Sequence, residues 1–240
     1  MKPLTLLLAL LLAACGGGDA DDFDAAETAG APRAAMAAPA VKVMEWGDST
    51  AASSQLSNGS SPSAEAQKVL RRLGYNFEVK HEAVGGMPAV NLLNGRHPLH
   101  LGVPFQQFPS LAWADIGMVR SGINEGRLGH TQEEFRDALQ RLVNKHRAAG
   151  KIIVLTTPSP MDPAIIGPAR VEYVEASAVT VRQVVRANPD IAVLCDQNRH
   201  AKEAGIVTWK VDGLHPNEEA TVLEGRFQAR CILRAAQLLR

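Results

Sequence analysis

The stretch Val41-Lys-Val-Met-Glu-Trp-Gly-Asp-Ser-Thr50 decides the fold. Its apolar residues predict a buried strand. Gly47-Asp48 predicts a tight turn, because glycine permits backbone angles that other residues resist and aspartate can bond back to nearby amides. The turn carries Ser49 to the C-terminal end of a first strand, where open α/β sheets place their ligands. A serine in such a turn more often caps the next helix, so this stretch alone does not establish an active site.

Downstream of this strand, strand-like apolar segments alternate with segments of helical periodicity. Such alternation is typical of a parallel sheet with helices on both faces. The sequence therefore predicts an α/β fold, a three-layer α/β/α sandwich with a five-stranded parallel sheet, over residues 41–240. A long irregular segment, 97–109, is a candidate wall of the ligand site. The expected strands are 41–46, 76–82, 114–120, 151–157 and 190–194, and the expected helices are 62–73, 87–93, 131–149, 171–185 and 217–239.

A second motif, Val211-Asp-Gly-Leu-His-Pro216, lies about 160 residues after Ser49. Asp212 and His215 stand three apart in this turn-forming segment. A serine nucleophile needs a base to accept its proton and a carboxylate to fix the tautomer of that base. Asp212 and His215 would supply both from one loop, although a D-x-x-H pattern by itself is weak evidence.

A third motif, Ser121-Gly-Ile-Asn-Glu125, lies between the other two. In this order the three motifs resemble those of the SGNH/GDSL hydrolase family of esterases and lipases. The resemblance runs from about residue 42 to the C-terminus, and it implies a flavodoxin-like fold and a carboxylic ester hydrolase. The G-x-S-x-G elbow of the α/β-hydrolases is missing, because Ala51 holds the position of its last glycine.

The resemblance implies roles for five residues. Ser49 matches the nucleophile, and Asp212 and His215 match the acid and the base of the last motif. Asn124 matches an asparagine whose side-chain amide donates to the oxyanion. The backbone amides of Ser49 and Gly86 are the other expected oxyanion donors.

Two departures from the family's pattern concern the loops rather than the triad. Gly86 ends the block Glu82-Ala-Val-Gly-Gly86. His81, just before this block, and Ala83 within it stand where the family usually has Asn and Gly, so either Gly85 or Gly86 could point its N–H into the site. Glu125 stands where the family usually has aspartate. In the family this acid supports the loop and takes no part in the chemistry.

The first forty residues carry a separate signal. Met1-Lys2 and the apolar run 4–12 read as a signal peptide that is too short to span a bilayer. Residues 12–15, Leu-Ala-Ala-Cys, resemble the lipobox of bacterial lipoproteins, which implies cleavage after residue 14 and lipidation of Cys15; the alternative is an ordinary signal peptide with an incidental cysteine. We expect a tether over 15–40 and a hydrolase domain over 41–240, lipid-anchored to the bacterial outer membrane and facing the periplasm or the exterior.

The remaining two cysteines, Cys195 and Cys231, would then lie in an oxidising compartment. The first falls in an expected strand and the second in the last expected helix, so they could meet. A disulfide and two separately buried thiols fit the sequence equally well.

The charge composition argues against nucleic acid as a partner, and the positions of the histidines argue against a metal site. With 25 basic and 25 acidic residues the chain has no basic patch for nucleic acid. His97 and His100 have a spacing that a metal could use, but no nearby Cys or carboxylate completes a site, so we expect them at a loop surface. No metal and no cofactor is expected. The other histidines expected to be partly exposed are His81, His130, His146 and His200.

Three functions from different classes fit these motifs. The first is hydrolysis of short acyl or acetyl esters through an acyl-enzyme intermediate, on a small-molecule, polysaccharide or lipid ester. The second is transfer of acyl or acetyl groups between cell-envelope polymers by the same triad. The third is a catalytically silent envelope-binding lipoprotein. The presence of all five key residues favours an enzyme.

Overall fold

The computed structural model describes residues 39–53, 56, 59–206 and 212–239. The predicted signal peptide, Cys15 and all but the last residues of the tether lie outside the described residues, so the proposed division of the chain at residue 40 stays a prediction. Val211, at the start of the second motif, also lies outside them.

The described chain is built on a parallel sheet of five strands in the order β2-β1-β3-β4-β5. This is the flavodoxin-like order, and it confirms the predicted fold. The inner strands β3 and β4 are buried along their whole length, as expected where both faces of a sheet are covered, whereas the edge strand β2 carries charged residues and is partly exposed. The strands are β1 (Val41–Gly47), β2 (Phe77–His81), β3 (Ile116–Arg120), β4 (Ile152–Thr156) and β5 (Ala192–Cys195).

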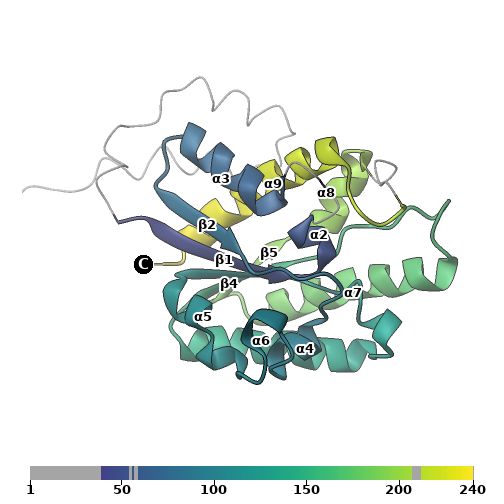
Figure 1. The fold of residues 1–240 in the computed structure, drawn as a ribbon, viewed down its shortest axis with the longest axis horizontal. Helices are drawn as coiled ribbons and strands as arrows, with labels where there is room; N and C mark the ends of the chain where they lie inside the picture. Colours follow the sequence, from purple (N-terminus) through teal and green to yellow (C-terminus); the bar gives the residue numbers. More distant parts are fainter. Residues whose placement is uncertain (1–38, 54–55, 57–58, 207–211, 240) are drawn as a thin grey trace, which may run out of the picture.

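Helices cover both faces of the sheet, as Figure 1 shows. On one face α3 packs against α9, with α8 beside α9, and on the other α6 packs against α4 and α7. The helix that follows β1 therefore lies on one face of the sheet, and the helix that follows the neighbouring strand β3 lies on the other. The carboxyl ends of these two strands form the switch point where such folds bind ligands. The helices are α2 (Ser49–Ala52), α3 (Pro62–Arg72), α4 (Ala89–Leu93), α5 (Pro109–Trp113), α6 (Gln132–Ala148), α7 (Pro168–Ala187), α8 (Gln197–Glu203) and α9 (Glu218–Ala236).

Helix starts follow from local capping chemistry. Thr131 accepts a hydrogen bond from the Glu134 amide, and the Glu134 carboxylate accepts one from the Thr131 amide at 2.7 Å, which completes a capping box before α6. Ser61 caps α3, where Pro62 occupies the first turn, and Asn217 caps α9. These signals explain why the long helices begin within a few residues of the predicted positions.

The segment 97–109, predicted as a long irregular stretch, has local structure of its own. It contains two 3₁₀ turns, Pro98–His100 and Phe105–Gln107, and it buries Phe105 and Phe108 in the main core. The Phe105 ring packs edge-on against Trp46 of β1, 5.0 Å between ring centroids. The aromatic side chains of this segment therefore belong to the core.

Two histidines predicted near the surface are fully buried, and both predictions were wrong. His97 bonds through Nε2 to the Glu82 carbonyl at 2.8 Å, because its segment folds back against the end of β2. His146 lies on the inner face of α6 against Trp46, with Nδ1 bonded to the Leu142 carbonyl. Burial lowers the pKa of His146 to about 4, and the bond to Leu142 only partly opposes this.

The structure joins Cys195 to Cys231 in a disulfide, with 5.5 Å between their Cα atoms. Cys195 ends β5 and Cys231 lies in α9. The bond therefore fastens the last helix to the edge strand of the sheet.

Candidate active site

Three side chains from two distant parts of the chain meet in one line of hydrogen bonds. Ser49 opens α2 directly after β1, and His215 lies in the loop that precedes α9. His215 Nε2 is 2.8 Å from Ser49 Oγ, and His215 Nδ1 is 2.7 Å from Asp212 Oδ2. The structure thus brings together the serine, histidine and aspartate that the sequence predicted as a triad.

Asp212 is held ionised by the loop that carries it. Its Oδ1 accepts the backbone amides of Leu214 at 3.0 Å and of His215 at 2.7 Å. Burial alone would raise the pKa of Asp212, but these amides and the His215 ring outweigh it and lower the pKa to about 2. A carboxylate that stays charged above this pH keeps Nδ1 of His215 protonated, so that Nε2 faces Ser49 as an acceptor.

The turn before Ser49 is fixed by packing and by one buried carboxylate. A Cβ on Gly47 would stand 2.7 Å from the Arg120 carbonyl and 2.9 Å from Ala51 Cβ, so it is the close approach of α2 and β3 that requires glycine here. Asp48 caps α2, accepting the amide of Thr50 at 2.9 Å and its hydroxyl at 2.7 Å. Burial raises the pKa of Asp48, against these hydrogen bonds and the charge of Arg120.

Asn124 presents an unused donor. Its side chain is 5 % exposed, and Nδ2 is buried without a hydrogen-bond partner among the described residues. Its Oδ1 accepts Arg127 Nε at 3.4 Å, which turns the oxygen towards Arg127 and leaves the amide hydrogens free. A buried amide without an acceptor is costly, so this donor fits an oxygen that arrives with a substrate.

The glycine pair at the end of the block Glu82–Gly86 lies beside the serine. The Val84 amide bonds to the Gly47 carbonyl at 2.9 Å, which aligns the block with the end of β1. A Cβ on Gly85 would lie 3.9 Å from Ser49 Cβ, and Gly86 adopts a φ of +77°, which favours glycine. Both glycines border the site, and the assignment of the oxyanion amide to Gly86 stays a prediction.

Glu125 ties the start of α4 to the turn of the third motif. Its two carboxylate oxygens accept the backbone amides of Ala89 and Gly122, both at 2.8 Å. Burial raises the pKa of Glu125 to about 7, although these bonds oppose it. This supporting geometry is the one expected for the acid at this position, and glutamate reaches both amides.

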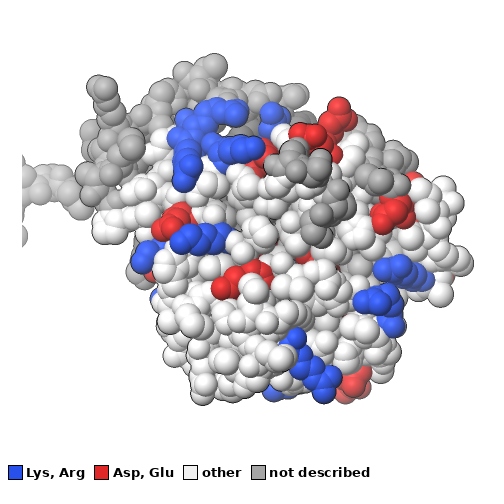
Figure 2. Space-filling model, viewed as in Figure 1, with Lys and Arg blue, Asp and Glu red and all other residues white. Residues whose placement is uncertain are grey.

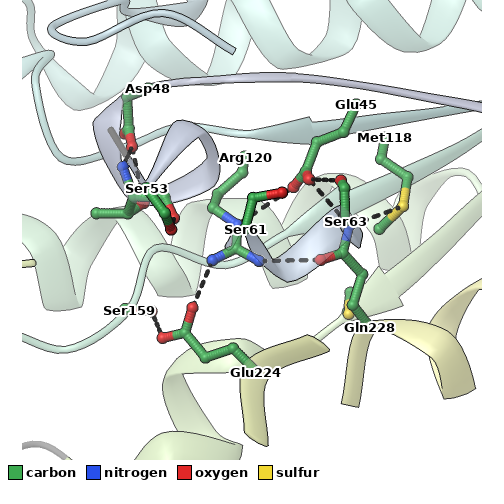
Figure 3. A network of polar contacts seen from close by, with 12 residues as sticks. Glu45, Asp48, Ser53, Ser61, Ser63, Met118, Arg120, Ser159, Glu224 and Gln228 are labelled. Atoms are coloured by element: carbon green, nitrogen blue, oxygen red, sulfur yellow. Dashed lines mark hydrogen bonds and ion pairs between the residues drawn. The ribbon is translucent and has the colours of Figure 1, made fainter. Parts of the chain in front are cut away.

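A buried polar network around Arg120, the register partner of Gly47, was not predicted from the sequence (Figure 3). Arg120 Nη1 is 2.8 Å from Glu224 of α9, and its Nε is 3.4 Å from Glu45 of β1. Gln228 donates to Glu45 at 3.0 Å, and Ser159 donates to Glu224 at 2.7 Å. The signal in the sequence was one charged residue inside each of two strands, Glu45 in β1 and Arg120 in β3. Charged residues are almost never buried unless they are paired, so these two positions indicated an ion pair.

The described residues contain no group of three His, Cys, Asp or Glu side chains that could hold a metal ion. His97 and His100 both bond to Glu82, the first to its carbonyl and the second to its carboxylate at 2.9 Å. None of the described helices is long and apolar enough to span a membrane.

A serine, histidine and aspartate in line at the switch point of a flavodoxin-like sheet define a serine hydrolase of the SGNH/GDSL type. The model of the GDSL-like lipase/acylhydrolase family matches residues 46–221, which include all three side chains, and the chain belongs to this family. Membership confirms the predicted class of enzyme, a carboxylic ester hydrolase. No curated protein matches the sequence.

Several solved structures share this fold at low sequence identity. The lipase/acylhydrolase from Enterococcus faecalis is 20% identical with a TM-score of 0.62, over 80% of this chain and 95% of its own. The psychrotrophic esterase EstA from a Pseudoalteromonas species is 17% identical with a TM-score of 0.61, over 82% and 98% of the two chains. The acetylxylan esterase Axe2 from Geobacillus stearothermophilus is 19% identical with a TM-score of 0.57, over 82% and 94%.

Replacing Asn124 with alanine tests the free donor. We expect kcat for p-nitrophenyl acetate to fall by roughly 10²–10³-fold, because one oxyanion donor is lost. Stability should change little, because Nδ2 has no hydrogen-bond partner to lose among the residues that the structure describes. Steady-state kinetics and thermal unfolding measure the two effects. If Asn124→Ala keeps the kcat of the wild type, Asn124 is not an oxyanion donor.

Glu125→Gln tests the raised pKa. The folded protein holds the Glu125 proton up to about pH 7 and the unfolded chain only to about pH 4.5, so this group's contribution to stability falls as pH rises between them. We expect the free energy of unfolding of the wild type, relative to Glu125→Gln, to fall by about 3 kcal/mol over that range in urea titrations. If the difference in unfolding free energy between the two proteins does not vary with pH, the raised pKa of Glu125 is contradicted.

Proposed function

We propose that the protein hydrolyses short acyl or acetyl esters in two steps, through an acyl group bound covalently to Ser49. The observation that carries this proposal is the unbroken line of hydrogen bonds from Ser49 Oγ through His215 to Asp212. The line exists in the free protein, so the base is already in contact with the proton that it must remove.

In the first step Ser49 Oγ attacks the ester carbonyl carbon while its proton passes to His215 Nε2. The negative charge that forms on the carbonyl oxygen is stabilised by the Asn124 side-chain amide and by the backbone amides of Ser49 and Gly86. His215 then gives its proton to the leaving alcohol, and the C–O bond of the ester breaks. Asp212 stabilises the imidazolium between these two transfers.

In the second step water takes the place of the alcohol. His215 accepts a proton from water as its oxygen attacks the acyl carbon, and the same donors stabilise the second oxyanion. His215 returns the proton to Ser49 Oγ as the acid leaves. The names of the solved structures with this fold, which include a lipase/acylhydrolase, an esterase and an acetylxylan esterase, support ester substrates of this general kind.

The proposal includes the place where the enzyme acts. The apolar run 4–12, the Leu-Ala-Ala-Cys sequence at 12–15 and the Gly- and Ala-rich segment up to residue 40 support an enzyme held by a lipidated Cys15 at the outer membrane of a bacterium. The described hydrolase residues would then face the periplasm or the exterior on a tether.

Ser49→Ala tests the reaction. We expect hydrolysis of p-nitrophenyl acetate to fall at least about 10³-fold, because the hydroxyl that contacts His215 Nε2 is lost, while thermal unfolding stays unchanged. A series of longer p-nitrophenyl esters measures the acyl length that the site accepts. Wild-type rates no higher than those of Ser49→Ala across the series would overturn the proposal. An added alcohol that captures most of the acyl group would assign the chain to acyl transfer.

Cys15→Ser tests the anchor. In a bacterial host we expect the wild-type chain in the membrane fraction and the variant in the soluble fraction of the envelope, since the thioether-linked lipid is the proposed attachment. Fractionation with an antibody to the folded domain measures the distribution. An unmodified wild-type chain recovered in the soluble fraction speaks against lipidation.

A further inference from the structure

A cavity of about 270 Å³ lies between the loop after Asn124 and the start of α7. Its walls come from the 3₁₀ turn Gly126–Leu128 and from the first two turns of the helix. The residues that line it are Ile123, Gly126, Arg127, Ala169, Arg170 and Tyr173.

This cavity adjoins the donors that face the ester carbonyl. Ile123 precedes Asn124 in the chain, and Arg127 Nε bonds to Asn124 Oδ1 at 3.4 Å. Arg127 Nη2 stands 3.3 Å from the point where a Cβ on Gly86 would lie. One guanidinium therefore borders both the cavity and the proposed oxyanion hole.

The charge that lines the cavity is positive. Arg127 and Arg170 face it, and among the described residues no carboxylate lies within ion-pair distance of either guanidinium. Arg170 Nε is buried and has no hydrogen-bond partner within the same part of the chain. Figure 2, in the orientation of Figure 1, shows Lys and Arg side chains gathered over the right-hand end of α7.

The helix adds to this charge. The 20-residue α7 begins at Pro168, next to the cavity-lining Ala169 and Arg170, and its N-cap residue Gly167 offers no side-chain cap. The first amides of a helix carry a partial positive charge that favours anions. An acceptor in the cavity would satisfy the Arg170 N–H that burial has deprived of water.

We propose that this cavity binds an anionic group, a carboxylate or a phosphate, carried by the ester substrate a few bonds from the scissile carbonyl. The inference rests on the proposed function and narrows its substrate class to charged esters. A planar guanidinium binds a carboxylate or a phosphate through two parallel hydrogen bonds. The guanidiniums of Arg127 and Arg170, on opposite walls of the cavity, would therefore orient the anionic group as well as attract it.

The test compares p-nitrophenyl esters of similar length with and without a terminal anionic group. The probes are mono-p-nitrophenyl glutarate, its methyl-capped neutral form, and the p-nitrophenyl ester of 4-phosphonobutyrate. We expect kcat/KM for at least one anionic ester to exceed that of the neutral ester at least tenfold, and we expect the preferred probe to identify the carboxylate or the phosphate as the natural group. The preference should shrink in 0.5 M salt, because screening weakens charge recognition.

Arg170→Gln should lower the ratio of anionic to neutral kcat/KM at least tenfold, mainly through KM, since this contact is made equally in the ground and transition states. Arg186→Gln is the matched control. It removes the same charge from the other end of α7, about 24 Å away at 1.5 Å per residue, and should keep the wild-type ratio.

Two results would overturn the inference, and they are distinct. In the first, hydrolysis depends on Ser49 but shows no preference for anionic esters, with or without 0.5 M salt. This result contradicts the anion site and keeps the proposed esterase activity. Hydrolysis of none of the three esters above the Ser49→Ala level removes the proposed function and the anion site with it. Should Arg170→Gln fail to fold, the salt dependence of the wild-type ratio decides.

Discussion

The guanidinium of Arg120 is fully buried at the carboxyl end of β3, and a buried cation is tolerated only where fixed acceptors replace its water. Glu45 of β1 and Glu224 of α9 are these acceptors, and Gln228 of α9 donates a hydrogen bond to Glu45, which links the helix to the strand. Ser49 follows β1, Asn124 follows β3, and the loop with His215 precedes α9. One buried guanidinium therefore ties together the three chain segments that carry the site, and removing it would leave Glu45 and Glu224 buried without the cation that they share.

Much of the fold could be predicted because its signals are local or ordered along the chain. Continuous apolar runs and capping residues such as Thr131 located the strands and long helices to within a few residues. The resemblance of the three motifs to those of the SGNH/GDSL family paired Ser49 with Asp212 and His215 across more than 160 residues. The support role of Glu125 also followed from its place in a motif.

The features that sequence did not show depend on contacts between distant elements. Glu45 and Arg120 look like surface charges until their pairing with α9 is seen, and His146 looks exposed until Trp46 is placed over it. The short α2 was missed because Asp48 caps only one turn, in a segment whose composition suggests a loop. The choice between a disulfide and two thiols needed the distance between β5 and α9.

The Cys195–Cys231 bond makes the timing of assembly depend on where the chain is. It fastens to the sheet the helix that brings Glu224 and Gln228 to Arg120, and that follows directly on the His215 loop. Thiols stay reduced in the cytosol, so a chain awaiting export lacks this constraint. If the chain is exported as proposed, the disulfide forms only after translocation, and α9 is then fastened to the sheet in the compartment where the enzyme acts.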